Sequence, residues 1–453
     1  MMQTERKSGF ADFTEGPFLK KIVLYTVPII LTGLLQLLFN AADLIVVGRF
    51  CGSDYVGAVG ATGSLINLLV NLFMGFSVGA GVCVAQGLGA KDKQLVHRTV
   101  HTAIPAAIVC GIFLTIIGIL FSGQFLIWMK TPDTQLPLST TYLKIYFAGV
   151  IPMLLYNFGA AILRAAGDTR SPLVYLTISG VVNVILNIVF VRFVGIDVAG
   201  VALATTISQV LSCVLVMINL SRRNDELKLQ WAKLRFHKKA LLRIVRIGLP
   251  AGLQGSLFAI SNVIIQSSVN SLGAVVLNGN SASSNIEGFI YTIMIGLQQT
   301  VMNFVGQNIG ARKYDNIRKI TRICLLCVFV SGLVFGLLAV AFRRPLLSIY
   351  LKDSAESIDF GASRLTVIGF TYYLCGIMDV LSGALRGMGY STSPMVSCIF
   401  GVCVLRIIWI VTVFAQEAFH TLAYLIVAWP LSWAVTSIVL LFIYLHCLKR
   451  ARA

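Results

Sequence analysis

The sequence predicts an all-α membrane protein with twelve transmembrane helices in two six-helix halves, related by a pseudo-two-fold axis along the membrane normal. Hydrophobic residues make up 57% of the 453 positions and charged residues only 12%, and the mean hydropathy is +0.85. Soluble domains carry about 25% charged residues, so this chain is not one of them. Apolar runs long enough to cross a bilayer recur along the chain, and its second half repeats the first.

Each apolar run of about 20 residues spans a hydrocarbon core of about 30 Å as a helix. We expect these helices at residues 20–42, 56–83, 97–120, 140–163, 172–194, 199–220, 244–270, 282–305, 319–341, 363–385, 394–415 and 421–446. The predicted organisation is an N-terminal segment 1–19, a first half 20–220, a basic linker 221–243, a second half 244–446 and a basic tail 447–453.

The placement of Lys and Arg predicts the orientation. The net charge is +18, and most basic residues fall at the two termini and in the loops that share their side of the membrane. The positive-inside rule assigns that side to the cytoplasm, which predicts a multi-pass protein of the cytoplasmic (inner) membrane. We expect the linker 221–243 to be solvated and close to anionic lipid headgroups. Because the basic residues do not gather on one soluble face, we expect no nucleic-acid partner.

The internal repeat has two closely similar registers. A shift of 222 residues places LRAAGDTRSP (163–172) on LRGMGYSTSP (385–394), and a shift of 221 places AQGLGAKD (85–92) on GQNIGARK (306–313). Two six-helix halves enter the membrane in the same direction, so the expected cavity lies at their interface. We expect the turns GLGAKD and GARKYD to end their helices through a glycine with positive φ.

Three acids are expected at or near membrane depth, namely Asp43, Glu287 and Asp379. A charge at this depth costs at least ~2.5–3.5 kcal/mol, so it usually has a partner or marks an ion or substrate path. We assign Asp43 to ion coupling, and Glu287 and Asp379 to a substrate cavity. The alternative for each is an interfacial side chain that extends to the headgroups.

The first helix carries a polar face that ends at Asp43. Phe39 and Gln36 lie four and seven residues earlier, so they share this face and are expected to line the substrate cavity. Pro28 removes a backbone hydrogen bond and favours a bend. We interpret it as a helix switch, with a static kink as the alternative.

The helix expected at 172–194 contains Asn183 and Asn187, four residues apart and therefore on one face. Amides are costly in lipid unless they are paired, so each requires a polar partner. The alternative is that these amides only join helices. Polar groups on neighbouring helices of the first half are Tyr142, Asn157 and Thr205.

Together these groups supply a carboxylate, amides and hydroxyls, which suit a proton or a hard cation such as Na⁺. A possible Na⁺ site comprises Asp43, Asn183, Asn187 and Thr205. The second half places Leu405, Trp409 and Val427 opposite Asn183, Asn187 and Thr205, so we expect no duplicate of this cluster. Arg406 is expected to pair with an acid across the bundle, and it is the only base expected deep in the bilayer.

These motifs resemble the MATE (multidrug and toxic compound extrusion) transporters. The resemblance extends from about residue 17 to 446 and rests on the Pro28 to Asp43 pattern, LRAAGDTRSP, GVALATTIS (200–208) and VGQNIGARK (305–313). The most similar branch keeps its cation site in the N-terminal half. That branch implies an ion site at Asp43, Asn183 and Thr205, with Tyr142 and Asn157 in the surrounding hydrogen-bond network and Gln36 facing the drug cavity.

One departure from the family concerns the residue four positions after Asn183. Many members have Asp there, whereas this chain has Asn187, which keeps an oxygen ligand and removes a negative charge. The resemblance implies a monomeric secondary transporter that exports organic cations or amphipathic compounds in exchange for Na⁺ or H⁺, without a cofactor. An enzyme is not expected, because HExxH or GxS motifs with a partner at membrane depth are absent, and the five histidines lie near helix ends or in loops. The alternative is a lipid-linked oligosaccharide flippase, whose cavity would need positive charge to hold pyrophosphate.

Overall fold

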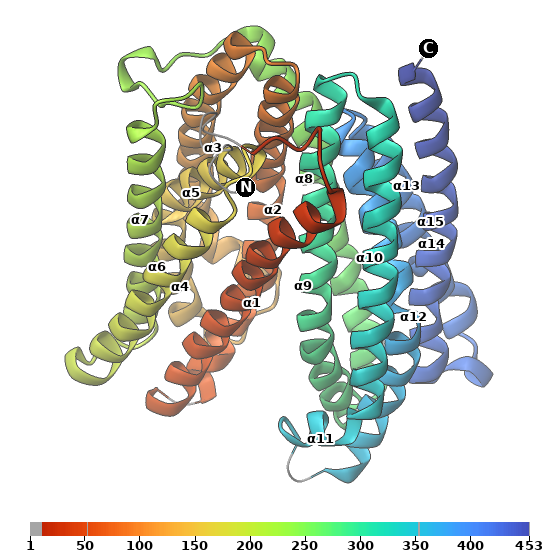
Figure 1. Ribbon diagram of the computed structural model, residues 1–453. Helices are drawn as coiled ribbons and strands as arrows, with labels where there is room; N and C mark the ends of the chain where they lie inside the picture. The colour runs from red at the N-terminus through yellow and green to blue at the C-terminus, as the bar shows by residue number, and fades with distance from the viewer. Residues whose placement is uncertain (1–10, 52, 352–353, 453) are drawn as a thin grey trace. The chain divides into compact units, whose positions relative to one another are not determined.

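The computed structural model describes residues 11–51, 53–351 and 354–452, and every regular element within these ranges is helical. The chain forms two compact units. The first contains residues 11–12 and Leu31–Ser256, and the second contains Phe13–Ile30 and Leu257–Ala453. Helices α1 (Phe18–Phe50) and α8 (Lys238–Asn270) therefore each contribute residues to both units (Figure 1).

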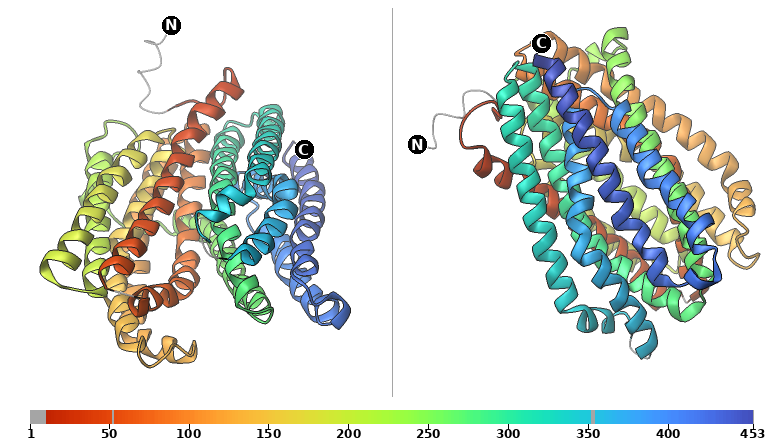
Figure 2. Two further views of the ribbon diagram at one scale, coloured as in Figure 1. Left: turned by 90° about the horizontal axis from the view of Figure 1, so that it is seen from below. Right: turned by 90° about the vertical axis from the view of Figure 1, so that its right-hand side faces the viewer.

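The first unit contains the C-terminal part of α1 from Leu31, helices α2 to α7 and the start of α8. Within it α6 and α7 are neighbours, and α3 contacts α2, α4 and α5 (Figure 2). The elements are α2 Ser53–Gly89, α3 Lys93–Trp128, α4 Leu136–Ala148, α5 Val150–Ala165, α6 Arg170–Ile188, the π-helix η2 Val189–Val194, α7 Val198–Arg222 and the 3₁₀-helix η3 Trp231–Lys233.

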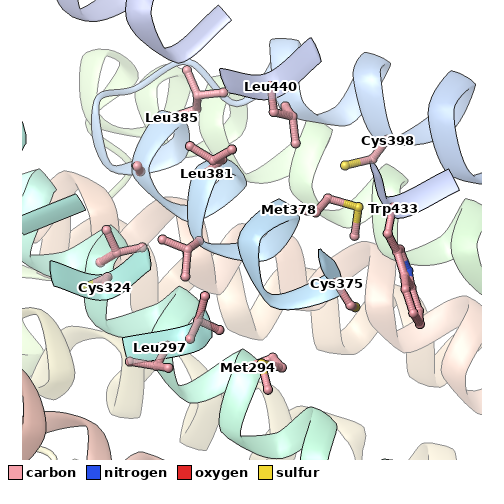
Figure 3. Close-up of a cluster of buried hydrophobic side chains, with 14 of the residues drawn as sticks. Met294, Leu297, Cys324, Cys375, Met378, Leu381, Leu385, Cys398, Trp433 and Leu440 are labelled. Carbon is pink, nitrogen blue, oxygen red and sulfur yellow. The ribbon is translucent and has the colours of Figure 1, made fainter. Parts of the chain in front are cut away.

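The second unit is organised around α12, which packs against α9, α10 and α15. The elements are α9 Ala274–Gly310, α10 Tyr314–Ala341, α11 Arg343–Ser348, α12 Ala355–Gly387, α13 Thr392–Cys398, the π-helix η4 Ile399–Val404, α14 Leu405–Trp409, the π-helix η5 Ile410–Phe414, the 3₁₀-helix η6 Glu417–Phe419 and α15 Leu422–Arg452. Side chains from these helices form the apolar core in Figure 3, where Met378 and Trp433 are among the labelled residues.

Ten helices in the described part of the chain are long and apolar enough to cross a membrane, and the bent pair α4 and α5 would make an eleventh. Helix α9 has 37 residues but is not among them. Its Asn, Ser and Gln side chains and Glu287 explain this, because they lower its mean hydropathy. The structure thus supports a multi-pass helical membrane protein, and the predicted total of twelve depends on α9.

The segment before α1 is anchored in the second unit. The ring of Phe13 stacks on Phe304 with centroids 4.0 Å apart. The backbone N–H of Phe13 donates to Gln307 Oε1 at 3.0 Å, and its carbonyl accepts from Asn308 Nδ2 at 2.9 Å. Further along, the hydroxyls of Thr26 and Thr300 are 2.7 Å apart. The start of α1 is therefore fixed to α9.

The start of α8 packs against α2 in the first unit through glycine. A Cβ atom on Gly252 would lie 2.0 Å from the carbonyl oxygen of Leu72, and one on Gly75 would lie 2.2 Å from the nitrogen of Gly252. Only glycine allows two helix backbones to approach this closely, as at small-residue crossings in membranes. Gly248 and Gly252 are thus required for this contact.

The repeat is visible in backbone conformation. Lys91 and Arg312 have φ values of 53° and 56°, and Gly167 and Gly389 have φ values of 92° and 93°. Each pair occupies matching positions in the two registers. The prediction that glycine supplies the positive φ in GLGAKD and GARKYD is wrong, because the basic residue two positions after the last glycine adopts it.

The linker 221–243 is less solvated than its composition predicts. The side chains of Leu227 and Leu229 are buried. The backbone N–H of Gln230 donates to His101 Nε2 at 3.0 Å, and that of His237 donates to Thr102 Oγ1 at 3.1 Å. The expectation of a solvated linker is therefore wrong for these residues, which hold the linker against the beginning of α3.

Candidate functional site

Three helices of the first unit bring together the four residues predicted as a cation site. Asn187 Nδ2 on α6 donates to Asp43 Oδ1 on α1 at 2.5 Å and to Asn183 Oδ1 at 3.2 Å. Asn183 Nδ2 donates to Thr205 Oγ1 on α7 at 3.3 Å. We call these four residues the amide–carboxylate cluster. It joins α1, α6 and α7 through one continuous chain of hydrogen bonds.

The orientation of Asn187 leaves one oxygen unused. The side chain is fully buried, and its Oδ1 has no hydrogen-bond partner in the described part of the chain. A buried carbonyl oxygen without a donor is costly, so such groups are rare and need an explanation. A cation that enters the cluster would provide this oxygen with a partner.

Tyr142 and Asn157, predicted to surround this cluster, are not hydrogen-bonded to it. Tyr142 is buried among apolar residues that include Val47 and Val201, and its ring lies 6.3 Å from that of Tyr146. Asn157 Nδ2 donates to the carbonyl of Met153 in its own helix at 2.8 Å. Their participation in ion coupling therefore stays a prediction.

The residues that precede Asp43 on α1 have distinct surroundings. A Cβ atom on Gly180 would lie 1.9 Å from the ring of Phe39, so this ring packs directly on the backbone of α6. Gln36 is exposed. Pro28 lies inside α1, which continues through it without a break, and the boundary between the units follows two residues later, after Ile30.

Glu287 in the second unit is paired with Arg364, a base that was not among the residues predicted from the sequence. Arg364 donates to it through Nε at 2.8 Å and Nη2 at 2.7 Å, and Arg364 Nη1 donates to Asn280 Oδ1 at 2.6 Å. Ser283 also donates to Glu287 at 3.0 Å. The sequence did contain a signal for this ion pair, because a buried acid requires a partner. In the 222-residue repeat Arg364 matches Tyr142, so it lies on the helix that corresponds to that of Asn157.

Asp379 is also buried in the second unit. Its Oδ1 accepts a hydrogen bond from Gln298 Nε2 at 3.2 Å, and its Oδ2 has no hydrogen-bond partner among the described residues. Asp379 forms no ion pair in the described chain. The roles of Glu287 and Asp379 in a substrate cavity stay predictions.

Arg406 does not pair with an acid, contrary to expectation. Its Nε donates to Ser432 Oγ at 2.9 Å, and its guanidinium carbon lies 4.9 Å and 5.7 Å from the ring centroids of Trp429 and Trp433. It is also not the only buried base, because Arg364 and Arg386 are buried too. The second unit is therefore richer in buried positive charge than its sequence indicated.

Comparisons with known proteins establish the family. The sequence profile named MatE matches residues 28–189 and 250–412, more than half of the chain, and the two matches begin at Pro28 and Pro250. The chain belongs to the MatE family. The two matches reproduce the 222-residue repeat. As a member, the chain is a membrane transporter and not an enzyme.

Full-length relatives agree with this assignment. The chain is 27% identical over 390 residues to the "Probable multidrug resistance protein YoeA" of Bacillus subtilis, covering 84% of each chain. It is 21% identical to the "Multidrug export protein MepA" of Staphylococcus saprophyticus, covering 88% of each. A solved MOP superfamily transporter from Pyrococcus furiosus has the same fold, with a TM-score of 0.91, 19% identity, and coverage of 97% of this chain and 98% of that chain.

Proposed function

We propose that this MatE protein is a secondary active efflux transporter that exports amphipathic organic compounds in exchange for Na⁺ or H⁺ through alternating access. The names of its relatives as multidrug resistance and multidrug export proteins support the substrate class. The observation that carries the coupling proposal is the hydrogen bond from Asn187 to Asp43. This bond links Asp43, the only acid of the amide–carboxylate cluster, to α6 through a neutral amide. No basic residue of the cluster compensates the charge of Asp43.

We derive the coupling step from the donor and the acceptor of the Asn187 amide, Nδ2 and Oδ1. In the present arrangement its N–H groups point at Asp43 and Asn183, which is favourable while the carboxylate is ionised. A proton or Na⁺ on Asp43 removes the need for this donor. Rotation of the amide would then bring Oδ1, unpartnered in the present arrangement, toward the cation. Neutralising Asp43 thereby changes how α1 is held to α6.

The donor set is compatible with both coupling ions. Asp43, Asn183, Asn187 and Thr205 provide carboxylate, amide and hydroxyl oxygens, the ligands of hard cations. With a single carboxylate in the cluster, one proton is sufficient to neutralise it. Dye efflux from vesicles under separate Na⁺ and H⁺ gradients identifies the ion, because only the coupled gradient drives transport.

The membrane arrangement that we propose has twelve transmembrane helices, with α9 as a full span. Its 37 residues reach about 55 Å at 1.5 Å per residue, longer than a bilayer core. Its polar side chains face protein at several positions, since Asn280, Glu287 and Asn303 are buried. We place the protein in the cytoplasmic membrane as a monomer, with both termini in the cytoplasm.

The decisive experiment is Asp43→Asn in everted membrane vesicles. We expect gradient-driven efflux of an ethidium-like dye to disappear while the protein level is unchanged, because the amide cannot take up a proton or provide charge for Na⁺. Asp133→Asn is the matched control, since Asp133 is exposed and lies outside the cluster. Coupled efflux that persists in the Asp43→Asn variant overturns the proposal.

The substrate preference is tested separately. Gln36 and Phe39 lie on the same face of α1 as Asp43, and an aromatic ring near a cation contributes ~1–2 kcal/mol. Cationic dyes should therefore compete more strongly than uncharged analogues of the same size. Equal competition would remove the argument for organic cations.

The alternative function is a lipid-linked oligosaccharide flippase, and the structure strengthens it in one respect. Arg364, Arg386 and Arg406 are buried, so positive charge is present among the helices of the second unit. However, Arg364 is already paired with Glu287. Measuring transfer of a pyrophosphate-linked lipid in reconstituted vesicles distinguishes the two functions.

A further inference from the structure

A group of buried basic and aromatic side chains lies in the second unit, outside the amide–carboxylate cluster. We call it the arginine–tryptophan cluster, and it comprises Arg364, Arg406, Trp429, Trp433 and Glu287. The guanidinium carbons of Arg406 and Arg364 lie 4.9 Å and 5.3 Å from the centroid of the same indole ring, that of Trp429. Trp433 lies 5.7 Å from the guanidinium carbon of Arg406.

The cluster contains two arginines and one carboxylate, which is paired with Arg364. Glu287 binds Arg364 through two hydrogen bonds, which satisfies both partners. No carboxylate in the described chain lies within ion-pair distance of Arg406. The cluster therefore contains two positive charges and one negative charge. An uncompensated guanidinium at this depth is costly, which favours a role in binding an anion.

Arg406 is held in place through its Nε, whereas its two terminal nitrogens form no hydrogen bond with the described residues. Ser432 donates its hydroxyl hydrogen to the carbonyl of Trp429 at 2.8 Å, so its oxygen accepts from Arg406 Nε at 2.9 Å. The terminal nitrogens Nη1 and Nη2 have no hydrogen-bond partner among the described residues. Arg406 is nevertheless only 5% exposed. A guanidinium held by stacking and one hydrogen bond presents two parallel N–H groups, the geometry that matches a carboxylate.

The backbone on both sides of Arg406 departs from regular α-helix. Helix α14 has five residues, and π-helices η4 and η5 precede and follow it. A π-turn contains one residue more than an α-turn, and such turns are frequent at functional sites. Counting the 222-residue repeat, Arg406 lies one position after the counterpart of Asn183. One extra residue in η4 would bring Arg406 to the place on its helix that Asn183 has in the first unit.

We propose that the arginine–tryptophan cluster binds the carboxylate of an amphipathic aromatic acid, with Arg406 as its main ligand and the two indoles beside the apolar body. The cluster extends the substrates of the proposed transporter to organic anions and zwitterions. As a transport claim it rests on the proposed function, whereas binding itself does not depend on Asp43.

A lipid headgroup is a less suitable source of the anion. Arg406 lies eight residues before the end of η5 and fourteen after the start of α13, which is roughly 12 Å and 21 Å at 1.5 Å per residue. These distances place it well inside a core of about 30 Å. A headgroup phosphate in an intact leaflet does not reach this depth.

The test measures binding to the full chain in phosphatidylcholine nanodiscs by calorimetry. The probes are biphenyl-4-carboxylate and its neutral analogue biphenyl-4-carboxamide, which have nearly the same shape. We expect the carboxylate to bind about tenfold more tightly, because a charge-assisted bidentate contact is lost with the amide. Equal affinities for the two probes overturn the proposal.

Variants locate the site. Arg406→Gln should abolish the preference for the carboxylate, and Arg406→Lys should reduce it while keeping the charge. If Arg406→Gln does not yield a folded protein by size-exclusion chromatography, the Lys variant decides. Arg192→Gln is the matched control, because Arg192 is exposed and also lies over a ring, that of Phe50 at 5.6 Å. Preference that persists in both Arg406 variants places the anion elsewhere and overturns the proposal.

Two further arms separate the outcomes. Asp43→Asn should keep carboxylate binding even though it abolishes coupled efflux, so failure of the coupling proposal and failure of this one are distinguishable. Nanodiscs with anionic phosphatidylglycerol should leave the probe's affinity unchanged. If phosphatidylglycerol displaces the probe, the cluster binds lipid phosphate and the small-acid proposal is wrong.

Discussion

The two units of the chain contain buried polar clusters of opposite chemistry. In the first unit Asp43 belongs to a cluster with two amides and a hydroxyl, and this cluster contains no base. In the second unit Glu287 is paired with Arg364, and Arg406 lies between indoles. Both units contain one repeated sequence, yet their buried side chains differ. We propose the oxygen-lined cluster of the first unit for a cation and the guanidinium of the second unit for an anion.

The comparison predicts that the acids of the two units differ most in their effect on stability. Glu287→Gln should lower the free energy of unfolding in detergent by about 3–5 kcal/mol, because it leaves the charge of Arg364 buried without a partner. Asp43→Asn should change it by less than about 1 kcal/mol, since Asp43 has no basic partner and is only half-buried. Denaturation monitored by circular dichroism measures both.

A double variant checks the reason for this difference. Glu287→Gln combined with Arg364→Gln should be less destabilised than Glu287→Gln alone, since no charge then stays unpaired. If the two substitutions are additive, the ion pair is not the cause, and the contrast between the two acids loses its explanation.

A smaller effect tests how the first cluster is held in place. Gly180→Ala should reduce stability by about 1–3 kcal/mol, because its methyl group would enter the space of the Phe39 ring, one helical turn before Asp43. Gly288→Ala is the matched control, with no atom within 4 Å of its new Cβ. Adding Phe39→Ala to Gly180→Ala should remove the steric part of the cost. Equal thermal stability of the two glycine variants would contradict this packing.

The ion preference of the first cluster should respond to a second carboxylate. Asn187→Asp places another negative charge beside Asp43, so Na⁺ should bind about tenfold more tightly, which is about 1.4 kcal/mol. Calorimetric titration with NaCl at constant ionic strength measures this change. Asn224→Asp, at an exposed position of the linker, should have no such effect. If neither variant gains affinity, the four oxygens do not form a cation site.

The smallest effect is expected at the surface of the first unit. The ammonium of Lys93, 2.8 Å from Glu226, lowers the pKa of that carboxyl below its ordinary value of 4.5. This contribution to stability is present above the ordinary pKa and is lost as the pH falls through the lowered one. Glu226→Gln should therefore reduce stability slightly near pH 7, and this loss should shrink as the pH falls below 4.5. A difference that does not depend on pH would mean that the ion pair contributes nothing.

Much of the fold and of the first cluster was predictable because both have strong local signals. Long apolar runs identify helices, and two amides four residues apart require polar partners, which structure provides for Asn183 and Asn187. The 222-residue repeat is confirmed by the two family matches. Pro28 as a switch and the cavity roles of Gln36 and Phe39 stay predictions.

The second cluster was missed for identifiable reasons. Arg364 is the tenth residue of α12, whereas the helix predicted from the sequence begins only at residue 363. A π-turn adds a residue to a helix without a recognisable sequence pattern, and the fixed 222-residue shift, which matches Leu405 with Asn183, takes no account of the π-helix η4. The positive φ of Lys91 and Arg312 was equally hidden, because non-glycine residues rarely adopt it.

The anchoring of Phe13 has a consequence for the biosynthesis of the protein. Phe13 leaves the ribosome well before its partner Gln307, which follows 294 residues later. At about 5–20 residues per second, this delay is roughly 15–60 s. During that time the apolar start of α1 lacks its native neighbours. We therefore expect truncation before α9 to leave a nascent chain whose N-terminal segment is recognised by membrane proteases, even when the helices of the first unit are complete.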